Sequence, residues 1–280
     1  MLEITGKAVM DAREHLRLAK VRTEAGTGLK SDELRAGTFL AEMEQQDITV
    51  KNNVLLAGMR LSLVTGGGVG EVVRISEKIV PPPLELKDGE VLALSLKNRK
   101  DLQEMAKETE KAGVAVKMAG SAFLPTLYVS ATYEMNARDI PFGRDNNAWL
   151  VGANLRWELF DGMRRWAERS LAKARHNAAE EYLSLQKKEI AFQSMESMLR
   201  REEAGKRLEV ARSARLDAAE GVRLISKRFS NSLAAIIEVL DAQTALNRAR
   251  VNLAENEADY AQATARVWYT AGIFLKEVMK

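Results

Sequence analysis

Residues 125–135 read Pro-Thr-Leu-Tyr-Val-Ser-Ala-Thr-Tyr-Glu-Met, and residues 149–159 read Trp-Leu-Val-Gly-Ala-Asn-Leu-Arg-Trp-Glu-Leu. After the proline, the odd-numbered side chains are apolar and the even-numbered ones are mostly polar. Successive side chains of a β-strand point to opposite faces, so this alternation predicts two strands that each have one apolar face. A polar loop, Pro141–Asn147, separates the strands. We therefore expect a hairpin.

Two tryptophans indicate that this hairpin belongs in a membrane. Trp149 and Trp157 share the apolar face, eight residues apart, which corresponds to about 26 Å at 3.3 Å per residue. A strand in an outer-membrane barrel has an apolar band of about 25 Å between two aromatic girdles. The apolar face between the tryptophans has no charge, whereas Arg156 and Glu158 fall on the other face. We interpret Trp149 and Trp157 as girdle residues; a half-buried hairpin in a soluble protein is the alternative.

Composition excludes several classes of function. The 280 residues are 46% apolar and 29% charged, with no cysteine and a formal net charge of +3. Without cysteine there are no disulfides and no thiolate metal sites. The small charge, with basic and acidic residues interleaved, does not favour nucleic-acid binding. No apolar run approaches the roughly 18 residues of a spanning helix, and the N-terminal residues lack the apolar core of a secretion signal.

The rest of the chain reads mainly as long helices. From Asp161 to Phe229 there is no proline, and apolar residues recur at spacings of three, four and seven. This pattern predicts one continuous coiled-coil helix with Asp161 as its N-cap. Helices are predicted for residues 1–25, 31–65, 98–120, 161–229 and 233–272.

Two features between these helices are less regular. Ser31 or Asp32 is expected to cap the second helix, and Asn98 or Asp101 the third. Residues 66–96 read as irregular, with possible short strands at residues 71–75 and 91–96 around the consecutive prolines 81–83.

The chain repeats itself at an offset of 206 residues. Glu14-His-Leu-Arg-Leu18 aligns with Glu220-Gly-Val-Arg-Leu224, and the register continues without a gap to Gly66 and Gly272. The repeated unit is a helix, a short break and a returning helix, which indicates one supersecondary unit used twice. The second copy also has the strand hairpin in front of it, whereas the first begins inside a helix. We therefore expect an N-terminally truncated form or a fragment of a longer protein.

Catalytic chemistry is not indicated. His15 and His176 both lie in charged helical stretches, where we expect surface positions. The run Gly66-Gly-Gly-Val-Gly70 matches neither the dinucleotide-binding pattern nor the phosphate-binding loop pattern. We expect no enzyme activity, no catalytic residues, no metal ligands and no cofactor.

Two carboxylates follow the break in the second copy. Glu238 and Asp241 are three residues apart and share a helix face. Asp32 occupies the place of Glu238 in the first copy. In a symmetric ring of subunits such residues would form a cation-selecting constriction, whereas in a monomer they would be solvated helix charges.

Four short motifs, in this order and spacing, resemble the TolC-like outer-membrane channel proteins of efflux pumps and type I secretion. They are Leu124-Pro-Thr-Leu127, Trp157-Glu-Leu-Phe-Asp-Gly162, Val239-Leu-Asp-Ala-Gln243 and Gly272. The resemblance covers residues 8 to 274 and implies a mainly α fold of long antiparallel coiled-coil helices with two membrane β-strands. It implies a homotrimer whose twelve-stranded barrel contacts outer-membrane lipid and whose helices continue as a tunnel through the periplasm.

The resemblance also implies partners and residue roles. The partners are a periplasmic adaptor and an inner-membrane transporter, with no cofactor and no nucleic acid. Glu238 and Asp241 match the acidic ring at the pore entrance. The positions that match tip-gating residues are Ser31, Asp32, Phe229 and Ala234. The positions that match adaptor-contact residues are Arg22, Gly26, Arg228 and Ser232.

Two of these positions depart from the family pattern. Phe229 stands in place of a gating tyrosine and lacks its hydroxyl. Ala234 stands in place of a gating arginine, so we expect the acidic ring to lack that counter-charge and to be more exposed.

These observations divide the chain into six segments with expected roles. They are residues 1–66, the end of the first repeat; 67–97, an equatorial linker; 98–123, a helix leading to the barrel; 124–160, the membrane hairpin; 161–273, the coiled-coil hairpin of the second repeat; and 274–280, a tail. The expected function is a passive channel subunit for efflux or secretion, located in the outer membrane and periplasm. The alternative is a soluble coiled-coil scaffold with a packed β-hairpin.

Overall fold

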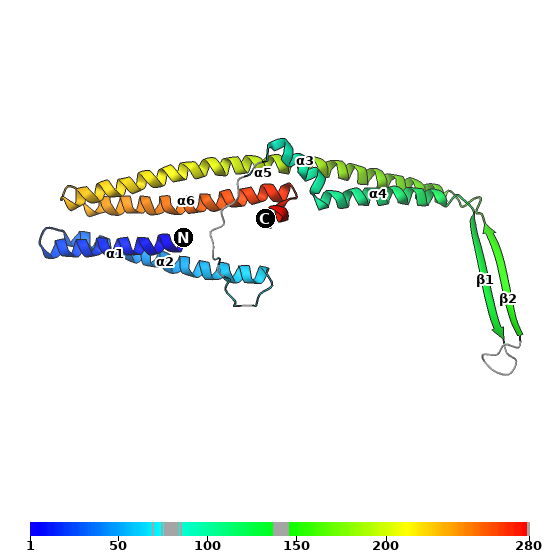
Figure 1. Cartoon of the computed structure of the whole chain (residues 1–280), viewed down its shortest axis with the longest axis horizontal. Helices are drawn as coiled ribbons and strands as arrows, with labels where there is room; N and C mark the ends of the chain where they lie inside the picture. The colour runs from blue at the N-terminus through cyan, green and yellow to red at the C-terminus, as the bar shows by residue number, and fades with distance from the viewer. Residues whose placement is uncertain (69, 74, 76–83, 85, 137–145, 279–280) are drawn as a thin grey trace. The chain divides into compact units, whose positions relative to one another are not determined.

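The computed structural model describes residues 1–68, 70–73, 75, 84, 86–136 and 146–278. Within these ranges the protein is mainly helical with one strand pair, which confirms the predicted fold class (Figure 1). The elements are α1 (Leu2–Glu24), α2 (Lys30–Val64), α3 (Asp88–Asn98), α4 (Lys100–Ser121), β1 (Thr126–Asn136), β2 (Asn146–Arg156), α5 (Arg164–Ser230), α6 (Ile236–Thr270) and α7 (Phe274–Val278). None of the helices in the described part is long and apolar enough to cross a membrane.

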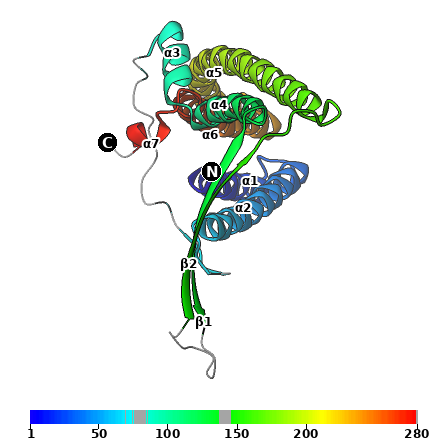
Figure 2. The same cartoon turned by 90° about the vertical axis from the view of Figure 1, so that its right-hand side faces the viewer.

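Two compact units make up the chain, residues 1–91 with 194–280 and residues 92–193. The first unit contains two antiparallel helical hairpins. One consists of α1 and α2, which lie side by side in both views, and the other of the C-terminal part of α5 with α6 (Figures 1 and 2). An apolar cluster draws on all four helices and consists of Ala8, Val9, Ala12, Phe39, Met43, Phe229, Ile236, Val239 and Leu240.

The first elbow, residues 25–29, joins α1 to α2. Gly26 has a φ of +70°, and the N–H groups of Thr27 and Gly28 both donate to the carbonyl of Arg22 at 3.0 Å. A Cβ atom on Gly28 would lie 2.9 Å from the Cβ of Arg22, so this position requires glycine. The turn thereby pairs a carbonyl that the end of α1 leaves without an intrahelical partner.

The second elbow, residues 231–235, joins α5 to α6 and repeats part of this turn 206 residues later, with Ala234 in the place of Gly28. Ser232 has a φ of +59°, and the N–H of Leu233 donates to the carbonyl of Arg228 at 2.8 Å. The repeat found in the sequence therefore corresponds to a repeated backbone conformation. In copy two, however, a residue with a side chain holds the left-handed position that glycine favours.

The second unit contains α4 packed against the N-terminal part of α5. The hydroxyl of Thr109 donates to the carbonyl of Ala179 at 3.3 Å, and Arg99 donates to Gln193 at 2.7 Å. These contacts place α4 along α5 for most of its length. The 67 residues of α5 form one helix, which confirms the prediction of an unbroken helix from Asp161 to Phe229.

The strands β1 and β2 form the predicted antiparallel hairpin. Leu127 pairs with Leu155, Ala131 with Val151, and Tyr133 with Trp149. Odd-numbered residues thus lie opposite odd-numbered residues, and the apolar face is continuous across both strands. β2 ends at Arg156, so Trp157 and Leu159 lie outside the strand that was predicted to contain them.

A buried ion pair at the start of α5 joins that helix to the end of α4, on either side of the hairpin. The carboxylate of Asp161 accepts hydrogen bonds from the N–H and the Nε of Arg165, at 2.9 and 2.8 Å. Arg165 also donates to the carbonyl of Ala122 at 3.2 Å. Burial alone would raise the pKa of Asp161, but the backbone N–H and guanidinium of Arg165 outweigh it and the pKa is lowered. Asp161 thus has the predicted capping role, although α5 itself begins at Arg164.

Several predictions of local structure were wrong. Residues 91–96 belong to helix α3, because Glu90 accepts the N–H of Lys87 at 3.0 Å and starts a helix in which Val91 and Ser95 share a fully buried face. Residues 71–73 and 75 form no strand.

The helix caps also differ from expectation. The N-caps of α2 and α4 are Leu29 and Arg99, and neither makes a side-chain cap bond. The elbow turn, rather than Ser31 or Asp32, starts α2. Arg74, the three consecutive prolines at 81–83 and the loop residues 141–145 lie outside the described residues.

We expect Ser232→Gly to stabilise the protein. The left-handed conformation costs a residue with a side chain about 1–2 kcal/mol, and glycine avoids this cost. Glycine loses more backbone entropy on folding, which offsets roughly half of the gain. The measurement is the thermal unfolding midpoint followed by circular dichroism. Ser230→Gly is the matched control, since Ser230 ends α5 without a positive φ. A midpoint that falls for Ser232→Gly as it does for the control would contradict the prediction.

Candidate functional site

The two elbows are joined to each other by Arg22. Its Nη2 atom donates to the carbonyl of Phe229 at 2.6 Å and approaches that of Ser230 at 3.4 Å. The guanidinium carbon lies 3.9 Å from the centre of the Phe229 ring. Residues 207 positions apart are thereby tied together at the end of the first unit. Sequence reasoning placed Arg22 and Phe229 in separate roles and missed this contact.

Arg228, the repeat equivalent of Arg22, binds within its own elbow. It donates to the carbonyl of Leu233 at 3.2 Å, and its Nη1 lies 3.6 Å from a carboxylate oxygen of Glu238. The other carboxylate oxygen of Glu238 accepts the N–H of Ala235 at 3.0 Å. Glu238 therefore starts α6 as well as carrying charge. Sequence analysis expected no arginine beside the acidic residues from position 234, and it did not anticipate this contact of Glu238 with Arg228.

The remaining predicted tip residues differ in exposure. Asp241 is exposed on α6, one turn beyond Glu238, and Ser31 is exposed at the start of α2. Asp32 is half-buried. Ala234 packs against the apolar cluster to which Phe229 belongs. The structure thus brings all of these positions to the two elbows or to the first turns after them.

A polar layer lies between α1 and α6 below the elbows. The carboxylate of Asp11 accepts a hydrogen bond from Gln243 at 3.1 Å and lies 3.8 Å from Arg250. His15 is half-buried beside it, and burial lowers its pKa although Asp11 and Glu14 oppose that shift. His176 is also half-buried and faces Gly113 of α4. The prediction that both histidines are simply surface residues was wrong, because helix packing covers them.

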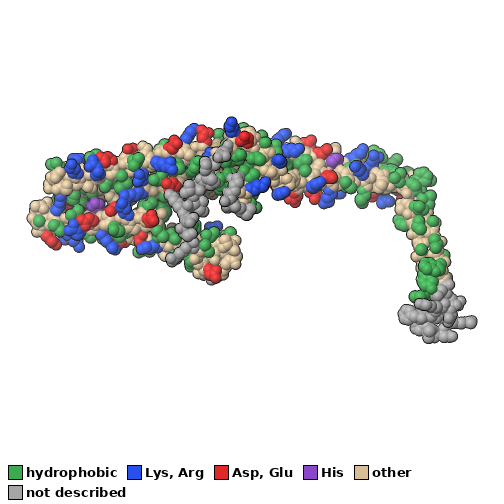
Figure 3. All heavy atoms as spheres, in the orientation of Figure 1, with side chains coloured by type: hydrophobic (Ala, Val, Ile, Leu, Met, Phe, Trp, Pro, Cys, Tyr) green, Lys and Arg blue, Asp and Glu red, His purple; other side chains and the backbone are tan. Residues whose placement is uncertain are grey.

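The strand hairpin exposes both of its faces. Val129 and Val151 on the apolar face are each 71% exposed, and Leu150 on the opposite face is 65% exposed. Figure 3 shows hydrophobic side chains gathered over the two strands. Apolar surface of this extent indicates a contact with lipid or with other strands.

The two tryptophans proposed as girdle residues have different environments. Trp149 stacks on Tyr133 across the strands, with ring centroids 4.7 Å apart. Trp157 lies beyond the end of β2, and its indole donates to the carbonyl of Phe123 at 3.3 Å. Trp149 thus lies within the hairpin, whereas Trp157 lies at the base of the hairpin, next to the end of α4.

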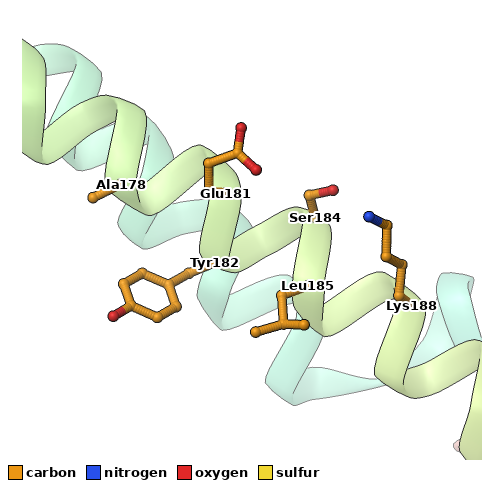
Figure 4. A pocket seen from close by; sticks show the side chains of 6 residues that line it. All are labelled: Ala178, Glu181, Tyr182, Ser184, Leu185 and Lys188. Carbon is orange, nitrogen blue, oxygen red and sulfur yellow. The ribbon is translucent and has the colours of Figure 1, made fainter.

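The grooves on this protein are shallow. A groove of about 460 Å³ runs along α5 and is lined by Ala178, Glu181, Tyr182, Ser184, Leu185 and Lys188 (Figure 4). All six residues come from one helix, so this is an exposed helix face and not an enclosed cavity. In a second groove, of about 590 Å³, Arg207 lies 3.8 Å from Asp259 and Arg200 lies 3.3 Å from Glu203. Both grooves are open to solvent, whereas small-molecule sites are usually concave and enclose most of the ligand.

Comparison with known proteins agrees with this geometry. Residues 91–272 match the family model of outer membrane efflux proteins. No curated protein matches the sequence significantly. The outer membrane protein VceC from Vibrio cholerae matches 97% of the chain at 19% identity, with a TM-score of 0.84. The outer-membrane channel OprN matches 97% at 19% identity, also with a TM-score of 0.84. The outer membrane channel CmeC from Campylobacter jejuni matches 98% at 16% identity, with a TM-score of 0.79.

These structural matches show the fold, and the chain spans 65%, 62% and 59% of the lengths of VceC, OprN and CmeC. The family match, in contrast, covers well over half of the sequence. The chain therefore belongs to the outer membrane efflux protein family, whose members are channel proteins of the outer membrane and periplasm and not enzymes.

Proposed function

We propose that this chain is a subunit of a homotrimeric outer-membrane channel that serves as a passive conduit for efflux or type I secretion. A periplasmic adaptor and an inner-membrane transporter would dock to it. The observation that supports this most directly is the strand hairpin, exposed on both faces, in a member of the efflux protein family. A hairpin packed on helices, as a soluble scaffold would have, does not expose its strands in this way.

The edges of the hairpin support an assembly. In the described residues β1 pairs only with β2, so each strand has one edge of unpaired N–H and C=O groups. Unpaired backbone groups are too costly in the hydrocarbon core of a membrane, and closed barrels avoid them. Strands from other copies of the protein would complete the pairing.

The apolar face would then contact outer-membrane lipid. It consists of odd-numbered residues, among which Ala131 pairs with Val151 and Tyr133 with Trp149. The other face carries Arg156 opposite Thr126 and Asn154 opposite Tyr128, which suits a water-filled lumen. Trp149 and Trp157 remain our proposed interface residues.

Val151→Arg should cost roughly 2–4 kcal/mol of folding free energy in the membrane, because it places a charge on the lipid face near the midplane. Asn154→Arg is the matched control and should be tolerated, since it faces the lumen. The measurement is the folded fraction of the full-length protein in lipid vesicles as a function of urea concentration. Equal losses for the two variants would contradict the assigned faces.

The second elbow would form the charged entrance of the tunnel. Glu238 and Asp241 lie in the first turns of α6 and share a face. In a trimer, three copies of each would surround one axis, and we propose that they set a preference for cations. Because Arg228 lies 3.6 Å from Glu238, Asp241 should carry the larger part of that preference.

Asp241→Asn should therefore reduce cation preference more than Glu238→Gln does. Reversal potentials in a salt gradient across a planar bilayer measure this for the full-length protein. Asp217→Asn removes an exposed carboxylate of α5 well before the second elbow and serves as the control. If neither tip variant shifted the reversal potential, Glu238 and Asp241 would be ordinary solvated charges.

The other tip positions keep the roles that the family resemblance implies. Ser31 and Asp32 would contribute to tip gating from the first turn of α2. Gly26 and Ser232 would face the adaptor at the apex of each elbow, where both have left-handed backbones. Arg22 and Arg228 would lie beside them, within reach of the same partner.

A further inference from the structure

Exposed apolar side chains continue past the end of the strand hairpin into α5. Leu159 and Phe160, between β2 and α5, are each 77% exposed, and Trp166 in the first turn of α5 is 66% exposed. Tryptophan is enriched where a bilayer meets water, because its ring is apolar and its N–H is polar. The apolar surface thus extends beyond the strands that we propose to lie in the membrane.

Positive charge gathers at the same end of α5. Residues 159–176 contain five basic and two acidic residues, whereas the rest of the chain contains 37 of each. The first turn of α5 has no acidic residue, although the positive end of the helix dipole favours one there. Figure 3 shows Lys and Arg side chains over the helices close to the hairpin. The excess charge is therefore concentrated where helix stability does not favour it.

Some of these cations have no acidic partner. The two arginines of the first turn do have partners, at 2.8 Å for Arg165 and 3.5 Å for Arg164. Among the described residues, no ion pair or side-chain hydrogen bond involves Arg169 or Lys173 of α5 or Lys117 of α4, and all three are exposed. These three side chains can therefore bind an anion from outside the chain.

The packing of α4 on α5 brings the three unpaired cations to one level. The two helices are antiparallel, and the hydrogen bond from Thr109 to Ala179 sets their register. Lys117 is eight residues after Thr109, so it lies level with Leu171, eight residues before Ala179. Along the helix axis it is thus between the two unpaired cations of α5. We define the junction patch as Leu159, Phe160, Trp166, Lys117, Arg169 and Lys173.

The side chains of the junction patch on α5 are directed toward the hairpin. Trp166, Arg169 and Lys173 are three and seven residues apart, so they lie on one face of the helix. The Cα–Cβ bonds of a helix tilt toward its N-terminus, which in α5 is the end next to the hairpin. Long basic side chains also extend along apolar surface to place their charge among polar groups. This arrangement fits a negatively charged headgroup layer above the cations, with acyl chains against the apolar residues.

We propose that the junction patch binds the anionic headgroups of phospholipids, such as phosphatidylglycerol, at the periplasmic surface of the outer membrane. Charge complementarity between unpaired cations and phosphate supports this partner. The continuity of the patch with the apolar hairpin favours a lipid over a soluble anion. The inference rests on the proposed channel function, because that function places the hairpin in this membrane. It adds a preference among lipids, which an apolar strand face alone does not provide.

The test uses full-length protein in detergent micelles and native mass spectrometry. It measures the dissociation constants of phosphatidylglycerol and phosphatidylethanolamine with the same acyl chains. The unmodified protein should bind phosphatidylglycerol more tightly. One basic residue near an anionic surface contributes about fivefold in binding, so Arg169→Gln combined with Lys173→Gln should reduce this preference at least fivefold.

Lys187→Gln combined with Lys188→Gln is the matched control. It removes two exposed charges from the same helix, about 27 Å farther along at 1.5 Å per residue, and should keep the preference. Equal affinity of the unmodified protein for the two lipids would overturn the proposal. An equal loss of preference in the two double variants would also overturn it.

A competition experiment separates the lipid from a soluble anion. Excess inorganic phosphate should leave phosphatidylglycerol bound, because phosphate has no acyl chain to contact Phe160 or Trp166. Sodium chloride at the same ionic strength is the reference. If phosphate displaced the lipid and chloride did not, the patch would be a site for a soluble anion, and the lipid assignment would be wrong.

Pore formation in planar bilayers separates this inference from the channel proposal. Pores formed by a protein without lipid preference would refute the lipid site and keep the channel. A preference that is lost in Arg169→Gln with Lys173→Gln, in a protein that forms no pores, would keep the lipid site and refute the channel.

Discussion

The carbonyl groups at the C-terminal ends of α1 and α5 are the constraint on which the tip depends. A helix that ends leaves its last carbonyls without partners, and they must find donors elsewhere. In each elbow the turn supplies a backbone donor to the carbonyl of an arginine, Arg22 or Arg228. The side chains of the same two arginines then donate to carbonyls further along. Arg22 donates across to the end of α5, whereas Arg228 donates within its own elbow.

The two copies of the repeat have similar elbow backbones but different side chains around the turn. The first elbow has glycine at its left-handed position. The second has Ser232 there, and a residue with a side chain is strained in that backbone conformation. Asp32 and Arg35 in the first copy correspond to Glu238 and Asp241 in the second, so the second copy carries more negative charge. Conserved turn geometry allows this divergence, because backbone hydrogen bonds do not depend on the side chains that follow them.

Local patterns in the sequence predicted the elements that local forces create. The alternation in residues 126–135 and 149–155 predicted the hairpin, since each position reports its own face of the strand. The apolar stripe after Asp161 predicted α5, because residues three and four apart lie on the same face of a helix. The interval 91–96 misled because it is a short, mostly apolar run that fits a strand or a helix. In the structure Val91 and Ser95, four residues apart, form a buried helix face, and Glu90 accepts the N–H of Lys87 at the start of that helix.

The candidate site was predictable only in part, because its key contacts join distant residues. Arg22 and Phe229 are 207 positions apart, and no spacing rule connects a side chain to a backbone carbonyl at that separation. The acidic pair was visible as two residues on one face, but the counter-charge on Glu238 came from the preceding helix across a turn. Sequence reasoning looked for that counter-charge at Ala234, where the family pattern has an arginine. Arg228 lies six residues earlier in the chain, and the left-handed turn at Ser232 is what brings it within 3.6 Å of Glu238. The charge at this elbow is therefore set by backbone geometry as much as by residue type, because the turn determines which cation the carboxylate meets.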